Sequence, residues 1–571
     1  MTKIDDQLAF SRSSVVCVLY KNHYRVNGMP AINGKVSLLA GAISCCAAAL
    51  AAHYSTNSAN AAEPEIVSRA PAASSAVDSI VWNLPFGEPS TLDPPNAPTL
   101  SGAGVVSNLC DALVTIDENY NLSGNIATFK VVNPNKIVYK IRTDVKFWDG
   151  SPVTAEDVAF SLKRAAEPAQ IVSFLFQNVS SIDVTAPDEV TVSFSKPGEM
   201  FNAEMATFAG MIMKKSYVDA AGKSLGTATG GLMCSGPFKL DGWKAGDSIV
   251  ITRNDAYWNK QRIPLAKKVT FTFVTDTAAY VQAMKAGEID GSYEVSPSAI
   301  PALQGINAGR LFYGPSMQSI QLQVASPSGP LADLKLREAF QSLIDRDAIA
   351  KVVYKDAAVA QYTALAPATW QNDAREIYAA AYPEFEKSRA FDVARAQSLV
   401  KESTYQGEPI VLAISAGEET TVRVAQLIQQ QAKKVGVNVT IKQMQPLEFS
   451  EAQYDAAKRT GIDFVLGTNF NAAQDPLEPT GFVYLPGGFY NLSGFDDPEV
   501  TRLINESRQN FDPKERAKMF VQMQDIYEKQ SGTIPIVSQR TVTFLNKRLA
   551  GAVTSFGYLS MPALAFVGSA Q

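Results

Sequence analysis

Histidine is almost absent from this sequence of 571 residues. The only two histidines, His23 and His53, lie within the first 53 residues, ahead of the part of the chain that we expect to fold. Catalytic sets of the Ser-His-Asp or Cys-His type, and zinc, nickel or copper sites with imidazole ligands, are therefore excluded from residues 62–571. We also expect ligand affinity to change little between about pH 6 and 7.5, where histidine usually titrates.

Strong net charge and long apolar runs are lacking as well. The formal net charge is −5, which gives no basic surface for nucleic acid. After residue 61 no stretch is long and apolar enough to span a membrane, and no loop has the Asp/Asn spacing of an EF-hand. Residues 222–226 match the GxSxG pattern of hydrolases, but without a histidine base we interpret them as a loop. We therefore predict no catalytic residues, no metal site and no cofactor.

The N-terminal 61 residues have the pattern of an export signal. Lys35 precedes the apolar run Val36 to Ala52, and Ala59-Asn60-Ala61 provides a small-residue cleavage site. This pattern predicts a signal peptide and an extracytoplasmic or periplasmic protein. A membrane anchor and a lipoprotein lipidated at Cys45 are the alternatives, and Met29 is an alternative start. Residues 62–77, rich in Ala, Ser and Pro, are expected to form a flexible tether.

Cleavage after Ala61 would leave two of the five cysteines, Cys110 and Cys234. An even number of cysteines in an exported chain favours a disulfide between them, because the compartment is oxidising. Two buried thiols are the alternative.

Strand and helix patterns alternate along the rest of the chain. Helix starts are indicated at Thr154, with Asp157 three residues later, and at Asp512-Pro513. Apolar residues at helical spacing run from Leu334 to Tyr354. Strand-like alternation occurs at residues 137–141, 190–194, 269–274, 320–324, 410–414 and 437–441. Such interleaving indicates a mixed α/β protein.

The densest motif is Tyr139 to Arg164, in which a strand is followed by Phe147-Trp148-Asp149-Gly150 and a helix start. This motif resembles the signature of extracellular solute-binding protein family 5, the oligopeptide- and dipeptide-binding components of ABC importers. Further segments are similar to the same family in the same order: residues 88–94, 235–240, 254–258, 283–290, 336–346 and 534–536.

The resemblance implies a type II periplasmic-binding-protein fold, in which two α/β lobes are joined by a hinge and one lobe carries an extra subdomain. The lobe that we call lobe I would hold residues 78–115, 196–308 and 545–571. Its subdomain would be residues 116–195, and lobe II would be residues 309–544. On this map Cys110 and Cys234 fall in the same lobe.

The function that the resemblance implies is binding rather than catalysis. An exported monomer would enclose a peptide or other small organic solute between its lobes and deliver it to ABC permease subunits in the membrane, with no nucleic acid involved. A secreted hydrolase on a similar scaffold is one alternative, which the missing histidine disfavours. A ligand-sensing receptor or chaperone is another.

The resemblance also points to candidate ligand contacts. Peptide-binding relatives carry an aspartate for the peptide amine four residues before a proline, and here that position is Ala472, beside the neutral Asn471. A shifted register, with Asp475 or another acid in that role, is the alternative. The residues that we expect to contact ligand are Thr468, Asn469, Phe470, Asn471, Asp475, Trp370, Ser101 and Gly102.

Overall fold

The computed structural model describes residues 64–326, 328–488 and 490–571. The predicted signal peptide and Cys45 lie outside these residues. No helix in the described ranges is long and apolar enough to cross a membrane.

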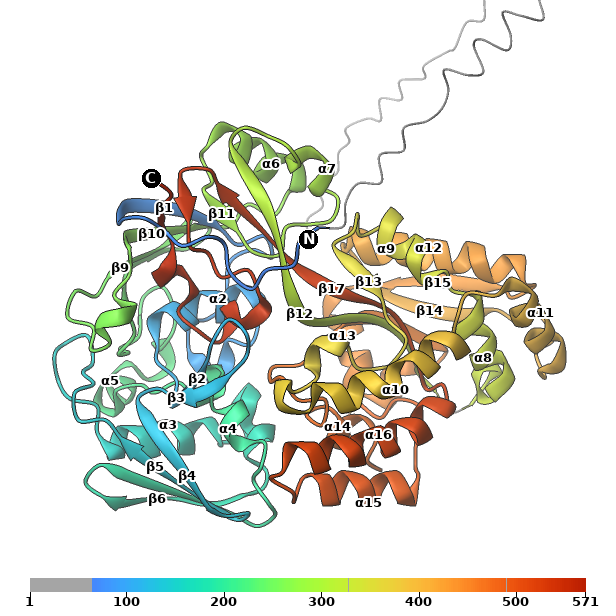
Figure 1. The fold of residues 1–571 in the computed structure, drawn as a ribbon, viewed down its shortest axis with the longest axis horizontal. Helices are drawn as coiled ribbons and strands as arrows, with labels where there is room; N and C mark the ends of the chain where they lie inside the picture. Colours follow the sequence, from blue (N-terminus) through green and yellow to red (C-terminus); the bar gives the residue numbers. More distant parts are fainter. Residues whose placement is uncertain (1–63, 327, 489) are drawn as a thin grey trace, which may run out of the picture. The chain divides into compact units, whose positions relative to one another are not determined.

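One sheet of 11 strands runs through both predicted lobes, in the order β15-β14-β16-β12-β17-β11-β1-β10-β9-β8, with β13 paired to β17 (Figure 1). The strands of lobe I are β1 (Val77–Asn83), β8 (Phe238–Lys244), β9 (Ser248–Arg253), β10 (Ala266–Thr272) and β11 (Gly291–Ser292). Those of lobe II are β12 (Gly309–Val324), β13 (Ala358–Ala360), β14 (Ile410–Ser415), β15 (Val439–Met444), β16 (Phe464–Phe470) and β17 (Thr533–Asn546).

The two longest strands, β12 and β17, join the two halves of this sheet. They pair antiparallel from Gly309 opposite Asn546 to Gln323 opposite Thr533. The ladder is irregular between Pro315 and Ser319. At one end β17 pairs with β11, and at the other end β12 pairs with β16. The connection between the lobes is therefore a strand pair with a local interruption.

A second sheet of four strands lies in the predicted subdomain, in the order β4-β5-β7-β6. Its strands are β4 (Ala127–Asn133), β5 (Lys136–Ile141), β6 (Val179–Ala186) and β7 (Glu189–Phe194). Helix α3 (Ala155–Ala165) packs against it, with buried residues of both forming one core cluster. As predicted, Thr154 caps this helix. Its hydroxyl accepts the backbone N–H of Asp157, and the Asp157 carboxylate accepts the backbone N–H of Thr154.

The remaining elements are short strands and helices that cover the sheets. The helices of lobe I are α2 (Leu100–Leu109), α4 (Phe201–Glu204), α5 (Lys215–Ala221), α6 (Thr277–Ala286) and α7 (Ile300–Leu303). Those of lobe II are α8 (Leu334–Leu343), α9 (Arg346–Val352), α10 (Arg375–Ser388), α11 (Val393–Glu402), α12 (Glu419–Lys434), α13 (Pro446–Tyr454), α14 (Thr480–Val483), α15 (Pro498–Ser507) and α16 (Pro513–Lys529). The short strands are β2 (Val114–Ile116), β3 (Leu122–Gly124), β18 (Leu549–Ala550) and β19 (Gly568–Ser569).

Separate hydrophobic clusters form the cores. The large cluster of lobe I contains Trp82 and Phe238, and a large cluster of lobe II contains Phe340 and Phe464. Cys110 and Cys234 lie in the lobe I cluster, where the structure joins them in a disulfide with a Cα–Cα distance of 4.9 Å. The boundaries of the lobes themselves stay a prediction.

The structure differs from two sequence expectations. Residues 64–76 do not form a free tether, because Val67, Ala70 and Ser74 donate backbone hydrogen bonds to residues 313, 552 and 569. The segment from Leu334 to Tyr354 is two helices rather than one. The first helix ends at Leu343, because Asp345 has extended backbone angles and its carboxylate caps the start of the second helix. Each of the six predicted strands overlaps a strand of the structure.

Candidate functional site

A cavity of about 550 Å³ is lined by residues of both predicted lobes. Lobe I and its subdomain contribute a mostly apolar wall, and lobe II contributes strand faces and loops. The lobe I and subdomain residues are Pro98, Ile171, Val172, Phe174, Leu175, Glu204, Thr207 and Phe208. Cavities of about 300–1,000 Å³ with an apolar wall and a few polar groups are typical of small-molecule sites.

Strand β12 places a row of polar side chains along the cavity. Ser319, Gln321 and Gln323 alternate with Ile320 and Leu322, which point into the lobe II core, because successive side chains of a strand face opposite sides. The exposed fraction of Gln321 is only 6%, and its Oε1 atom has no hydrogen-bond partner among the described residues. A buried acceptor without a partner costs about 1–3 kcal/mol, so this wall is suited to a polar ligand.

Four of the expected contact residues line the same cavity. Thr468, Asn469 and Phe470 belong to the end of β16, where Asn469 pairs with Ser319 of β12, and Asn471 follows directly. Phe470 keeps 45% of its surface exposed, although it is aromatic. The structure therefore brings these four residues together with the β12 row. Their contact with a ligand stays a prediction.

Asp475 does not line this cavity, because its carboxylate is engaged elsewhere. Its Oδ2 accepts hydrogen bonds from Arg516 Nη2 at 2.5 Å and from Gln371 Nε2 at 2.8 Å. Arg516, on α16, also forms an ion pair with Glu199 of lobe I. The side chains of Arg516 and Asp475 are 2% and 3% exposed. Asp475 therefore belongs to a buried ion-pair network that connects the lobes.

The other three expected contacts also lie away from the cavity. Trp370 is 8% exposed and stacks on Tyr378 within a hydrophobic cluster of lobe II. Ser101 and Gly102 are buried in helix α2, where the Gly102 amide donates to the capping hydroxyl of Thr99. Contact of these three residues with a ligand stays a prediction.

Two carboxylates that sequence reasoning did not name do line the cavity. Glu204 ends α4, and Glu478 follows the β16 loop, where its two oxygens accept the amide N–H groups of Ala472 and Ala473 at 3.2 and 3.0 Å. Burial raises the pKa of Glu204 to about 7 and that of Glu478 to about 8, and the charge of Glu204 contributes to the latter. No lysine or arginine lines the cavity in the described part of the chain.

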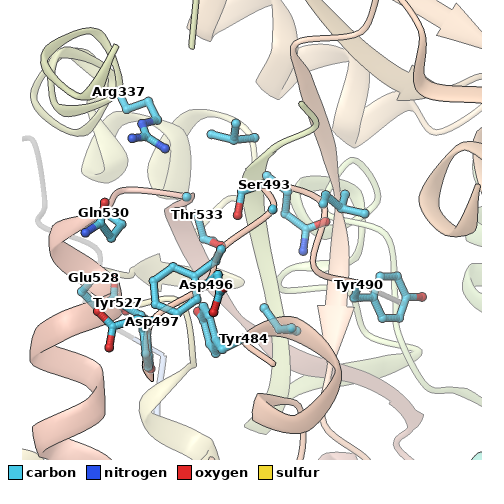
Figure 2. Close-up of a pocket in the computed structure, with 17 residues that line it drawn as sticks. Arg337, Tyr484, Tyr490, Ser493, Asp496, Asp497, Tyr527, Glu528, Gln530 and Thr533 are labelled. Atoms are coloured by element: carbon cyan, nitrogen blue, oxygen red, sulfur yellow. The ribbon is translucent and has the colours of Figure 1, made fainter. Parts of the chain in front are cut away.

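A smaller pocket of about 260 Å³ adjoins the cavity, since Gln323, Tyr484 and Thr533 line both. Figure 2 shows the Arg337 side chain extending from α8 toward the other labelled residues. Burial lowers the pKa of Arg337 below its usual range. Its Nε atom has no hydrogen-bond partner within the residues that the structure describes. No group of three or more metal-ligating residues occurs in this described part.

Comparison with known proteins identifies the family. The profile of the bacterial extracellular solute-binding proteins, family 5 (Middle), matches residues 122–491. The chain belongs to this family. As a family 5 solute-binding protein it has the two-lobed fold with a hinge, and its family consists of extracytoplasmic substrate-binding proteins that work with ABC permeases. The fold class and the family inferred from the motifs are thus confirmed.

Named relatives agree with this assignment. The glutathione-binding protein GsiB of Escherichia coli (strain K12) is 25% identical over 472 residues, which cover 81% of this chain and 89% of the relative. The ABC transporter substrate-binding protein CtaP of Listeria monocytogenes superposes with a TM-score of 0.75 at 19% identity, covering 87% of this chain and 100% of that one. DppA of Helicobacter pylori, solved with the peptide STSA, gives a TM-score of 0.73 at 18% identity, covering 87% and 99%.

Proposed function

We propose that this solute-binding protein captures a short peptide or a peptide-like organic solute in the 550 Å³ cavity and delivers it to an ABC permease. The observation that carries the proposal is the buried polar row of Ser319, Gln321 and Gln323 in a cavity lined by both lobes. Amide and hydroxyl groups both donate and accept hydrogen bonds, as the backbone of a peptide does. Apolar residues such as Phe174 and Phe482 would enclose the side chains of the solute.

Ligand capture would act through the equilibrium between open and closed lobes. A solute that contacts both walls of the cavity stabilises the closed arrangement by its differential affinity for that state. The permease would then bind the closed form, and the strand pair β12–β17 would serve as the hinge. No chemical step is needed, and we expect the protein to act as a monomer without a cofactor.

The names of the relatives support a peptide-like solute, because one is a glutathione-binding protein and another was solved with a peptide. We further propose that residues 1–61 direct export, with lipidation at Cys45 as the alternative. A role as a ligand-sensing receptor or a secreted hydrolase is the remaining alternative, and a peptidase assay on the pure protein would detect the hydrolase.

A thermal-shift screen tests the proposal. The purified protein is heated with di-, tri- and tetrapeptides, glutathione, opines and sugars, and we expect a subset of the peptide-like solutes to raise the melting temperature. Q321L should lose most of that shift, while Q261L, at an exposed position outside the cavity, should keep it. If no small solute stabilises the protein, or if Q321L and Q261L behave alike, the proposed binding site is wrong.

A further inference from the structure

The smaller pocket of about 260 Å³, called the side pocket below, is built entirely from lobe II. Besides Gln323, Tyr484 and Thr533, the residues Val483 and Tyr490 line both the side pocket and the cavity. The two spaces are therefore contiguous along a shared wall. A solute held in the cavity lies close enough to extend one of its side chains into the side pocket.

Arg337 supplies the positive charge of these two spaces. Of the residues that the structure describes, it is the only lysine or arginine that lines either one. Its side chain extends from α8 toward the other labelled residues of the pocket (Figure 2). Glu204 and Glu478 line the cavity but not the side pocket. An acidic group of a solute would therefore find its cationic partner in the side pocket and not in the main cavity.

The guanidinium of Arg337 is partly removed from water and has no partner. No hydrogen bond or ion pair of Arg337 occurs in the described ranges, and its Nε atom is buried without an acceptor. Burial lowers its pKa, and Asp333 and Glu338 act on it only through their charges. The carboxylate of Asp333 instead accepts backbone N–H groups of residues 335, 336 and 404. A guanidinium has five N–H donors, so an anionic oxygen in the side pocket would satisfy a group that the protein leaves unsatisfied.

The acidic residues of the side pocket do not provide this partner. Glu528 forms a buried ion pair with Arg389 at 2.7 Å. Asp497 caps helix α15, where its carboxylate accepts two backbone N–H groups. Asp496 is exposed, so water and salt screen its charge. No buried carboxylate without a partner in the described residues therefore opposes an anion at Arg337.

Neutral hydrogen-bond donors lie beside the arginine in the same lining. Ser493 and Gln530 contribute a hydroxyl and an amide, and Gln323 contributes a second amide at the shared wall. Gln323 is 9% exposed, although its side chain is polar. Hydroxyl and amide groups donate hydrogen bonds to carboxylate oxygens. The side pocket thus combines a guanidinium with neutral donors, which suits a carboxylate.

We propose that the side pocket binds an acidic side chain of the solute, and that Arg337 determines this specificity by pairing with its carboxylate. The inference deepens the proposed function and rests on it. The planar guanidinium can donate two parallel hydrogen bonds to one carboxylate. A neutral amide side chain of the same size would leave the guanidinium without an anionic partner, so the pocket selects acidic over neutral side chains.

Pairs of tripeptides that differ by one charge test this inference. Glutamate or glutamine replaces one residue at a time in a tripeptide of alanine, and each pair is titrated by calorimetry. We expect the glutamate peptide to bind at least about tenfold more tightly at one of the positions, because a desolvated charge gains its partner. R337M should abolish this preference while the glutamine peptide binds as before, which also verifies folding. R337K keeps the charge without the planar fork and should retain part of the preference.

The matched control is R423Q. Arg423 lies on α12 of lobe II, is half exposed, pairs with Glu419 and lines neither space. R423Q should keep the full preference for glutamate.

Three results would overturn the inference and leave the proposed function standing. The first is equal affinity for glutamate and glutamine at every position, and the second is a preference that persists in R337M. The third is that sodium acetate or phosphate alone raises the melting temperature through Arg337 while the peptides show no preference, which would indicate a separate anion site. If the unmodified protein binds no solute at all, the proposed function fails and the inference falls with it.

Discussion

The pH dependence of stability should depend on Glu478. Burial raises the pKa of this glutamate to about 8 from the usual 4.5, so between these values the folded state binds a proton that the unfolded state has lost. The free energy of unfolding therefore falls as the pH rises through this window. One pKa unit corresponds to about 1.4 kcal/mol, so the loss between pH 5 and 8 amounts to at most about 4 kcal/mol. E478Q should remove this part of the pH dependence.

Urea denaturation of the unliganded protein at pH 5, 6, 7 and 8 measures the effect. In E478Q the Nε2 group of glutamine cannot accept the second of the two amide N–H groups, so the substitution also changes the absolute stability. The readout is therefore the slope of the free energy of unfolding against pH. E506Q is the control: Glu506 is half exposed and paired with Arg502 on α15, so its removal should change the slope little. A pH slope of E478Q within about 1 kcal/mol of the unmodified protein over this range would refute the reasoning.

Three further outcomes are expected. Replacing both Cys110 and Cys234 by alanine opens a loop of 124 residues and should cost about 2–5 kcal/mol, measured by calorimetry; an unchanged melting temperature would contradict a stabilising disulfide. E199Q removes the lobe I carboxylate that faces Arg516 and should lower the free energy of unfolding, measured in urea, by about 1.5–3 kcal/mol, and R516M should lower it further. If E199Q is as stable as the unmodified protein, the contact between Glu199 and Arg516 is not formed. Q321L should leave the free energy of unfolding unchanged or slightly higher, because the Oε1 atom of Gln321 has no hydrogen bond to lose, while peptide affinity should fall about tenfold. A loss of stability above about 1 kcal/mol would mean that Gln321 acts in the core instead.

Much of the fold was accessible from the sequence because local signals agree with it. The Thr154–Asp157 capping box and the Asp512-Pro513 helix start are short-range features, and both occur in the structure. The sequence did not predict the break between the two helices at Asp345, because residues at helical apolar spacing continue across it. The capping carboxylate of Asp345 is the local feature that separates the helices. The pairing of residues 64–76 could not be predicted, because it depends on partners more than 200 residues away.

Only the part of the cavity wall near the end of β16 was predicted from the sequence. Residues 468–471 were predicted from the family resemblance, and the structure places them along the cavity at and just after the end of β16. Gln321 lies on a strand whose pairing with β16 depends on tertiary structure. The alternation of glutamine with apolar residues at 321–323 was the available signal for that face. Asp475 was expected at the ligand, but the charge of Arg516 engages it instead.

The absence of histidine was an incomplete guide to pH dependence. Burial raises the pKa of Glu204 to about 7 and that of Glu478 to about 8, which places two carboxylates in the range assigned to imidazole. These two residues line the cavity, so a solute that contacts them would bind with a pH-dependent affinity, and the flat affinity expected between about pH 6 and 7.5 stays a prediction.

The pairing of β12 with β17 also has a consequence for the order of folding. Strand β17 begins at Thr533, more than 200 residues after β12 begins, yet it pairs with β11 and β13 as well as with β12. Contacts between such distant segments form slowly, because a long loop must close before they stabilise the chain. Neither lobe can complete its sheet before the final segment arrives. A chain synthesised from its N-terminus therefore completes the 11-stranded sheet that joins its lobes only in a late step.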